Sequence, residues 1–159
     1  MTLLNKEPVG RVEKSLKQFD PKMRVIILDS SARTANEAAS SLSCEVGAII
    51  KSLLFKTENS FTLFLVSGDK KVSFNKIKRI LDVTDVSMAS ADDVKNITGY
   101  TIGGVSPVGH LNKIDIFIDN SLDRFKSLYA AAGHPNCIFE ISFTNLQKIT
   151  NGSTQDITQ

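Results

Sequence analysis

The most constrained stretch of this chain is a twelve-residue segment, Gly99–His110, which is dense in residues with special backbone requirements. It holds four of the nine glycines, one of the four prolines and one of the two histidines. The adjacent Gly103 and Gly104 allow positive φ angles and a close approach of a ligand to the main chain. Pro107 fixes its own φ and favours an extended conformation at Ser106. The pattern therefore predicts a rigid, shaped loop, which we interpret as a binding loop.

Two common phosphate-binding motifs do not describe this loop. Its paired glycines do not form a GxGxxG pattern, and no Gly-Lys-Ser/Thr triplet ends it. The simpler alternative for such a segment is a long turn that joins a helix to a strand. The density of glycine, proline and histidine favours the binding interpretation.

Composition limits the class of protein. With 159 residues, 42% hydrophobic and 23% charged, the chain is expected to form one domain over 1–159. A net charge of +2 is compatible with a nucleic-acid partner without requiring one. The two cysteines and two histidines have no metal-ligand spacing, so neither a metal nor a cofactor is expected. We find no signal peptide or membrane span, which predicts a cytoplasmic protein.

A second informative stretch, Val46–Phe55, is almost entirely apolar and contains one lysine, Lys51. An unpaired buried ammonium is costly, so this side chain must reach the edge of the core or meet a polar partner. Lys51 is then either an edge-strand lysine that opposes aggregation or a charge directed into a polar pocket. The stretch by itself leaves both interpretations open.

The remaining pattern alternates short strands and helices. We expect about six or seven strands and about five helices, which is an α+β domain. The strands are expected at 24–28, 48–56, 61–67, 86–89, 113–119 and 137–141. The helices are expected at 8–19, after the capping box Thr34–Glu37, at 74–81, after Ser90, at 121–129 and after the cap Thr144. The polar tail 151–159 is expected to be frayed.

Three polar features have two interpretations each. The basic residues at 70–79 (Lys70, Lys71, Lys76, Lys78 and Arg79) form a solvated helix face or contact a phosphate backbone, but the aromatic residues of a single-strand binder are missing. Thr34 is favoured as a helix cap and could also offer its hydroxyl to a pocket. Asp119 is favoured as a turn residue, with a pocket carboxylate as the alternative.

Several of these motifs, in this order, resemble the YbaK/ProX aminoacyl-tRNA deacylase family. The resemblance covers the chain from about Val9 to Thr150. It implies the fold of the family, a mixed, partly barrel-like sheet flanked by helices. The motifs are Thr34-x-x-Glu37-Ala38-Ala39, Ile50-Lys51-Ser52-Leu53-Leu54-Phe55, Ser67-Gly68-Asp69, Thr98-Gly99-Tyr100, Gly103-Gly104-Val105-Ser106-Pro107-Val108-Gly109-His110, Ile118-Asp119 and Ala131-Ala132-Gly133.

The resemblance implies a free-standing enzyme that hydrolyses the ester between a wrong amino acid and the 3′ end of a tRNA. The implied substrate is mischarged tRNA, similar to Cys-tRNA(Pro) or Ala-tRNA(Pro), and the candidate protein partner is a synthetase such as prolyl-tRNA synthetase. The alternative is a non-catalytic module of the same fold that binds a tRNA end, a nucleotide or a synthetase.

The resemblance also implies a set of site residues. Lys51, Gly104 and His110 are the expected catalytic residues. The expected substrate-binding residues are Thr34, Ser52, Gly103, Val105, Ser106, Pro107, Gly109 and Asp119.

The chemistry of ester hydrolysis gives these residues plausible roles. N–H groups of a glycine loop can stabilise the negative charge that develops on the carbonyl oxygen, and Lys51 can anchor the terminal ribose or phosphate. No Ser or Cys nucleophile is paired with a histidine and an acid in a recognisable motif. The attacking group is therefore expected to be water, which His110 could orient, or the thiol of a cysteine substrate.

The loop combines features of two branches of the family, which leaves the amino-acid specificity open. Ser106 resembles the cysteinyl-tRNA(Pro) deacylases, in which a Gly-Gly-x-Ser-Pro-x-Gly loop is followed by a polar residue. His110 resembles less characterised relatives with a Gly-Gly-Val-Pro-Pro-x-Gly-His loop. The thiol-assisted mechanism is open for the same reason.

Overall fold

The structure, a computed structural model, describes residues 2–159 as an α+β fold, as the sequence predicts. Its helices are α1 (Glu7–Phe19), α2 (Ala35–Leu42), α3 (Phe74–Leu81), α4 (Ala91–Thr98) and α5 (Phe143–Thr150). Its strands are β1 (Ile26–Ile27), β2 (Ile50–Lys56), β3 (Phe61–Ser67), β4 (Ser87–Met88), β5 (Asp115–Asp119), β6 (Leu128–Ala131), β7 (Cys137–Ile141) and β8 (Ser153–Gln155). Short 3-10 helices cover Leu3–Asn5, Val46–Ala48 and Asn120–Arg124.

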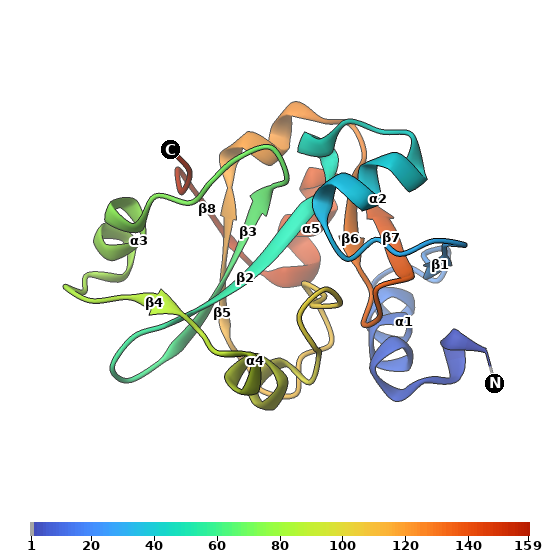
Figure 1. Ribbon diagram of the computed structural model, residues 1–159, viewed down its shortest axis with the longest axis horizontal. Coiled ribbons are helices and arrows are strands. Elements are labelled where there is room, and N and C mark those ends of the chain that lie inside the picture. The colour runs from blue at the N-terminus through green and yellow to red at the C-terminus, as the bar shows by residue number, and fades with distance from the viewer. Residues whose placement is uncertain (1) are drawn as a thin grey trace.

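The strands form two sheets that lie side by side (Figure 1). The larger sheet has the order β4-β2-β3-β5-β8, and the smaller has the order β1-β7-β6. A parallel bridge between Ile49 and Tyr129 joins the two sheets where β2 begins. The sheets do not close into a barrel within residues 2–159. The expected barrel-like closure is therefore limited to the bridge between Ile49 and Tyr129.

Local signals account for most of the elements. β2 and β3 lie at the predicted strands 48–56 and 61–67 and form an antiparallel hairpin, in which Lys51 is opposite Val66 and Ser52 is opposite Leu65. The hydroxyl oxygens of Thr34, Ser73 and Ser90 each accept a hydrogen bond from the N–H three residues later, at the starts of α2, α3 and α4. The predicted starts of these helices are confirmed.

The predicted helix at 121–129 is wrong. The chain makes a short 3-10 helix at Asn120–Arg124 and then enters β6, which pairs with β7. Leu128 and Ala130 are buried on one face of β6. The apolar spacing fits both a helix and a strand here, and pairing with β7 decides between them. Similarly, Ser142 rather than Thr144 caps α5.

The predicted fraying of the tail is also wrong. β8 pairs in parallel with β5, and Ile157 is fully buried beside α3 in a second core cluster with Phe55, Phe64 and Ile77. The last residue, Gln159, donates its backbone N–H to the Lys71 carbonyl oxygen at 2.9 Å. A polar sequence alone gave no sign that the tail completes the sheet.

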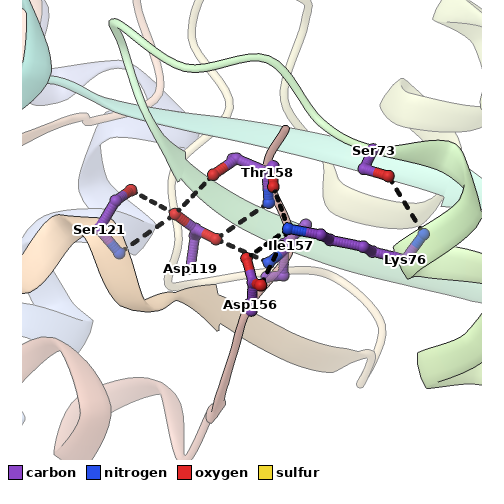
Figure 2. Close-up of polar contacts among 7 residues, drawn as sticks. All are labelled: Ser73, Lys76, Asp119, Ser121, Asp156, Ile157 and Thr158. Carbon is purple, nitrogen blue, oxygen red and sulfur yellow. Dashed lines mark hydrogen bonds and ion pairs between the residues drawn. The ribbon is translucent and has the colours of Figure 1, made fainter.

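The tail is held by a group of buried polar contacts, which we call the Asp119 junction and define by Asp119, Ser121, Ile157 and Thr158 (Figure 2). Asp119 Oδ1 accepts from the N–H groups of Ile157 and Thr158 at 2.8 and 3.2 Å. Asp119 Oδ2 accepts from the Thr158 hydroxyl and from both the N–H and the hydroxyl of Ser121. A fully buried carboxylate is therefore satisfied by five donors, as a buried charge requires.

Candidate active site

A cavity of about 390 Å³ lies where the two sheets meet the glycine-rich loop. Its wall draws on α2, the strands β2, β4, β6 and β7, α4 and the first part of the loop. Most of the side chains are aliphatic, among them Ala38, Ile49, Ala130 and Ile138. The lining contains no Asp, Glu or His among residues 2–159; its titratable side chains are those of Arg33, Lys51 and Tyr129.

One wall of the cavity is an open strand edge, which we call the β2 edge and define as Ile50–Leu54. β3 pairs with the other edge of β2 over its whole length. On the cavity side, the pairings described for residues 2–159 place β4 only at Phe55 and Lys56, and the bridge to β6 lies at Ile49. Between these two contacts this edge of the strand has no paired neighbour, and only its Leu54 carbonyl oxygen is bonded, to the Ala89 N–H, among residues 2–159.

The β2 edge presents main-chain polar groups to the cavity. The Leu54 carbonyl oxygen points away from β3 and accepts from the Ala89 N–H at 2.9 Å. Because residues two apart in a strand direct their main-chain groups to the same side, Ser52 directs its N–H and carbonyl toward the open edge. The Ser52 side chain belongs to the same site, because this residue is part of the cavity lining.

Ser52 Oγ is the unusual atom of this wall. Within residues 2–159 it is the one buried side-chain oxygen or nitrogen without a hydrogen-bond partner. Leaving a hydroxyl buried and unpaired costs about 1–3 kcal/mol. This hydroxyl is buried, although Ser52 as a residue is part of the cavity lining.

The opposite wall is the first half of the glycine-rich loop, which contributes Ile102, Gly103 and Val105 to the lining. The Gly104 N–H donates to the Thr101 carbonyl oxygen at 2.9 Å. Gly103 has φ +94°, so Thr101–Gly104 is a turn of type II, which favours glycine at this position.

The turn decides which N–H groups remain for a ligand. The N–H of Gly104 is used within the turn, although the sequence suggested Gly104 as a catalytic donor. By contrast, the N–H groups of Gly103 and Val105 make no hydrogen bond with any of residues 2–159. The free donors of the loop therefore flank Gly104.

The second half of the loop packs away from the cavity. Ser106 is fully buried, and its Oγ accepts from the Val108 N–H at 3.2 Å. The Tyr100 hydroxyl donates to the carbonyl oxygens of Val108 and Gly109 at 2.7 and 2.8 Å. Burial raises the pKa of Tyr100 to about 12, which keeps this phenol a donor at neutral pH.

Arg11 of α1 completes this clamp from the other side. Its Nε donates to the Gly109 carbonyl oxygen at 2.9 Å, and its guanidinium carbon lies 4.7 Å from the centre of the Tyr100 ring. Gly109 has φ +75°, and a Cβ there would lie 2.6 Å from the Tyr100 hydroxyl oxygen. Pro107, Gly109 and His110 line a separate shallow hollow against α1 and α5.

His110 has a partner inside the loop rather than in the cavity. Its Nε2 lies 2.6 Å from the Ser106 carbonyl oxygen, so this nitrogen carries the proton that it donates. Burial lowers the pKa of His110, against the opposing effect of this hydrogen bond, and the nearby Arg11 charge lowers it further. The imidazole is accordingly neutral near pH 7 and closes the end of the loop.

Lys51 is among the residues that line the cavity, together with Gly103 and Val105, as the sequence suggested. Its Nζ donates to the Lys70 carbonyl oxygen at 2.5 Å. Cross-strand partners share a face, and Val66, the partner of Lys51, belongs to the cluster beside α3. Burial lowers the pKa of Lys51, while Asp69 raises it and Lys71 lowers it. The ammonium is thus tied to the Lys70 carbonyl of the turn that follows β3.

Two other expected residues have structural partners. Thr34 lines the cavity, and its Oγ1 accepts from the Glu37 N–H at 3.1 Å as the cap of α2. Asp119 is not part of the cavity lining, because its carboxylate is used by the tail in the Asp119 junction. The structure therefore brings Lys51, Ser52, Thr34, Gly103 and Val105 together, and leaves Gly104, Ser106, Pro107, Gly109, His110 and Asp119 outside the lining.

Arg33, Met88 and Ile102 are among the lining residues that sequence reasoning missed. Arg33 is exposed on the rim, and its guanidinium has no ion pair or hydrogen bond with residues 2–159. A Cβ on Gly103 would lie 2.7 Å from Arg33 Cγ, so the stem of the arginine runs along the turn. The proximity of Arg33 to the predicted cap Thr34 was the available signal, whereas the placement of Met88 and Ile102 depends on tertiary structure.

No cluster of three or more His, Cys, Asp or Glu side chains that could hold a metal ion occurs within residues 2–159. No helix in the same range is long and apolar enough to cross a membrane.

Comparison with known proteins defines the class. The aminoacyl-tRNA editing domain family matches residues 29–149, and the chain belongs to this family. A proline–tRNA ligase of Caldicellulosiruptor bescii is 31% identical over 153 residues, covering 91% of this chain and 25% of the ligase. The chain thus spans about a quarter of the length of such ligases. The uncharacterized protein YwhH of Bacillus subtilis is 30% identical over 134 residues and covers 84% of this chain and 85% of YwhH.

Solved structures agree with this assignment. The crystal structure of a proposed trans-editing enzyme for prolyl tRNA synthetase has a TM-score of 0.91 and 33% identity, and covers 97% of this chain and 98% of that protein. The protein APE2540 has a TM-score of 0.87 and 29% identity over 94% of this chain and 99% of its own. The resemblance deduced from the motifs is confirmed.

Proposed function

We propose that this protein is an aminoacyl-tRNA deacylase that hydrolyses the ester of mischarged tRNA in the cytoplasm, on substrates similar to Cys-tRNA(Pro) or Ala-tRNA(Pro). The observation that carries the proposal is the pairing of free donors with free acceptors across one cavity. Gly103 and Val105 line the cavity from the loop, and their N–H groups have no partner within residues 2–159. Ser52 lines it from the β2 edge, with its main-chain groups directed away from β3 and its buried Oγ unpaired.

An aminoacyl ester has an acceptor and a donor that match the unpaired N–H groups of the loop and the acceptors of Ser52. The ester carbonyl oxygen becomes negative as water attacks, and preorganised N–H groups stabilise that charge. The α-ammonium of the amino acid is a donor, for which the Ser52 hydroxyl and carbonyl are suitable acceptors. The aliphatic lining then receives a small amino-acid side chain.

The lining also restricts the mechanism. Without a carboxylate or imidazole at the cavity wall, the protein contributes positioning and electrostatic stabilisation rather than a general base. Water, or the thiol of a cysteine substrate, is the attacking group. Ser52 has no partner that could activate it as a nucleophile.

The other expected site residues act indirectly in this proposal. Lys51 holds the turn after β3 to β2 and adds positive charge beside an anionic substrate. Gly104, Ser106, Pro107, Gly109 and His110 keep the loop in the shape that presents Gly103 and Val105. A synthetase such as prolyl-tRNA synthetase is the candidate partner, because relatives occur within proline–tRNA ligases.

The test is release of labelled amino acid from tRNA(Pro) charged with alanine, cysteine or serine. Wild-type protein should release at least one of them faster than buffer, and Lys51→Ala should reduce this release. Lys95→Ala removes an exposed lysine of α4 and serves as the matched control. Retention of all three labels, together with measurable tRNA binding, would favour the alternative of a non-catalytic binding module.

A further inference from the structure

The turn that follows β3 carries one acidic side chain, Asp69, close to Lys51. Asp69 comes directly before Lys70, whose carbonyl oxygen accepts from Lys51 Nζ at 2.5 Å. A Cβ on Gly47 would lie 3.0 Å from Asp69 Oδ2, so the carboxylate lies beside the chain that leads into β2. Burial lowers the pKa of Lys51, and the Asp69 charge opposes this effect. The carboxylate and the ammonium are therefore near enough to interact.

Asp69 is nevertheless paired with another cation, Arg124, at the end of the 3-10 helix that follows β5. Nη1 and Nη2 of Arg124 donate to the two carboxylate oxygens at 3.1 and 2.7 Å, a bidentate geometry that a lysine cannot provide. By contrast, Lys51 makes no ion pair within residues 2–159. The Asp69 carboxylate is thus directed to the guanidinium and not to the ammonium.

Arg124 is fixed by contacts other than the ion pair. Its Nε donates to the Ser121 carbonyl oxygen at 2.7 Å, and Ser121 itself belongs to the Asp119 junction. Its Nη2 also donates to Ser67 Oγ at 2.9 Å. The guanidinium carbon lies 4.8 Å from the centre of the Phe125 ring. The guanidinium is therefore held in place by neighbouring groups and presents its remaining donors to the turn after β3.

Other charged groups surround the two cations. The charges of Lys71 and Lys70 act on Lys51 and on Asp69, respectively, and those of Asp119 and Glu45 act on Arg124. The Asp119 carboxylate is already bound within the Asp119 junction. Asp69 is thus the acid whose position decides whether Lys51 has an acidic partner.

We infer that Arg124 is a positioning residue for Lys51: it holds the Asp69 carboxylate away from the ammonium, which stays available for an anionic group of the substrate. This inference rests on the proposed function. An ammonium has three donors, and within residues 2–159 Lys51 donates to the Lys70 carbonyl alone. Lys51 is half-buried and lines the cavity, so a carboxylate bound to it would compete with the substrate for the remaining donors.

The first experiment measures the pKa of Lys51 in the protein without substrate, from the Cε chemical shift of isotope-labelled lysine as a function of pH. The signal is assigned by its loss in Lys51→Arg. In Arg124→Gln the pKa of Lys51 should rise, because Asp69 is free to pair with the ammonium. In Asp69→Asn it should fall, because no acid of the turn then opposes the effect of burial. The variant with both substitutions should return toward the wild-type value, since one charge of each sign is removed.

The double variant separates this role from a loss of local structure. If Arg124→Gln only loosened the turn, Lys51 would become more exposed, and its pKa would rise in the double variant as well. Such a rise would overturn the inference. Arg124→Lys keeps the cation and should restore most of the wild-type pKa of Lys51. Lys17→Gln removes a cation that pairs with Glu13 at 3.6 Å on α1, outside the cavity lining, and as the matched control it should leave that pKa unchanged.

Deacylation kinetics test the consequence for the substrate. Arg124→Gln should raise the KM for aminoacyl-tRNA about fivefold, the size expected for one exposed charge pair, and should leave kcat within about twofold of wild type. Adding Asp69→Asn should restore the KM, because the competing carboxylate is removed. In a Lys51→Ala background, Arg124→Gln should change the KM by less than about twofold, since no ammonium remains to be paired. An undiminished effect in that background would show that Arg124 does not act through Lys51 and would overturn the inference.

The two measurements separate this inference from the proposed function. The expected order of Lys51 pKa values, without release of amino acid from any charged tRNA, would support the role of Arg124 at Lys51 and contradict the proposed hydrolysis. Wild-type hydrolysis together with an unchanged pKa of Lys51 in Arg124→Gln would overturn the inference and leave the proposed function in place.

Discussion

The cavity and the Asp119 junction are both built around polar groups in an apolar setting, but they treat those groups in opposite ways. At the junction, one carboxylate accepts from five donors, and the whole set is internal to the protein. In the cavity, Ser52 Oγ and the N–H groups of Gly103 and Val105 have no partner within residues 2–159.

We interpret the Asp119 junction as a contribution to stability and the cavity as a contribution to function. A satisfied buried network stabilises one conformation, whereas unpaired polar groups cost free energy unless a ligand forms hydrogen bonds with them. Substitutions at the junction should therefore change folding, and substitutions in the cavity should change substrate binding or turnover. Substitutions in the Asp119 junction and in the cavity can test this contrast.

The largest effect is expected from Asp119→Ala. It leaves the N–H groups of Ile157 and Thr158 and the donors of Ser121 without an acceptor, at about 1–3 kcal/mol for each group that stays buried. We expect the free energy of unfolding to fall by about 4 kcal/mol, measured by urea denaturation. Asp115→Ala, at an exposed position of the same strand, should change it by less than about 0.5 kcal/mol.

Gly103→Ala should have the next largest effect, and on turnover. At φ +94° an alanine is strained, and its Cβ would lie 2.7 Å from Arg33 Cγ, so the turn must shift and misalign its donors. We expect kcat for deacylation to fall about 10²-fold, close to the loss of one oxyanion donor. Gly10→Ala, where a Cβ meets nothing within 4 Å, should leave kcat unchanged, and a similar loss there would contradict this assignment.

Ser52→Ala sharpens the comparison directly. Removing the buried, unpaired hydroxyl should leave the free energy of unfolding unchanged or raise it by up to about 1–3 kcal/mol, because no internal hydrogen bond is lost and the cost of burying the hydroxyl is removed. The KM for aminoacyl-tRNA should rise about fivefold to tenfold, which corresponds to about 1–1.4 kcal/mol, the net value of one ordinary hydrogen bond. Parallel denaturation and steady-state kinetics test the pair of effects. A large loss of stability with unchanged KM would reverse our interpretation of this residue.

The smallest effect concerns the loop clamp and pH. Burial keeps the pKa of His110 below its ordinary 6.5, so below pH 6.5 the unfolded chain binds the proton more strongly than the folded protein does. Stability should therefore decrease as the pH falls from about 6.5 toward the lowered folded-state pKa. His110→Gln should reduce this pH dependence of unfolding, and His134→Gln is the control at the other histidine. An identical pH dependence in His110→Gln and wild type would argue against the buried neutral imidazole.

Much of the fold follows from local patterns. The strands β2 and β3 and the starts of α2, α3 and α4 lie where the sequence predicts them. The stretch around Leu122–Tyr129 was misassigned because its apolar spacing fits two periods, and the choice depended on a partner strand. The tail was misassigned because its order depends on Asp119, far away in sequence.

In the candidate site, too, some features follow from the sequence and others depend on long-range contacts. Sequence alone selected Lys51, Ser52 and the glycine-rich loop, because a lone lysine in an apolar run and a dense Gly-Pro segment are unusual at the level of residue type. Only the tertiary structure determined that Gly104 uses its N–H within the turn, that Gly103 and Val105 keep theirs free, and that Arg33, Met88 and Ile102 surround the mouth. Residue identity fixes which groups can donate, accept or pack, whereas long-range contacts decide which of them are already satisfied and which remain for a ligand.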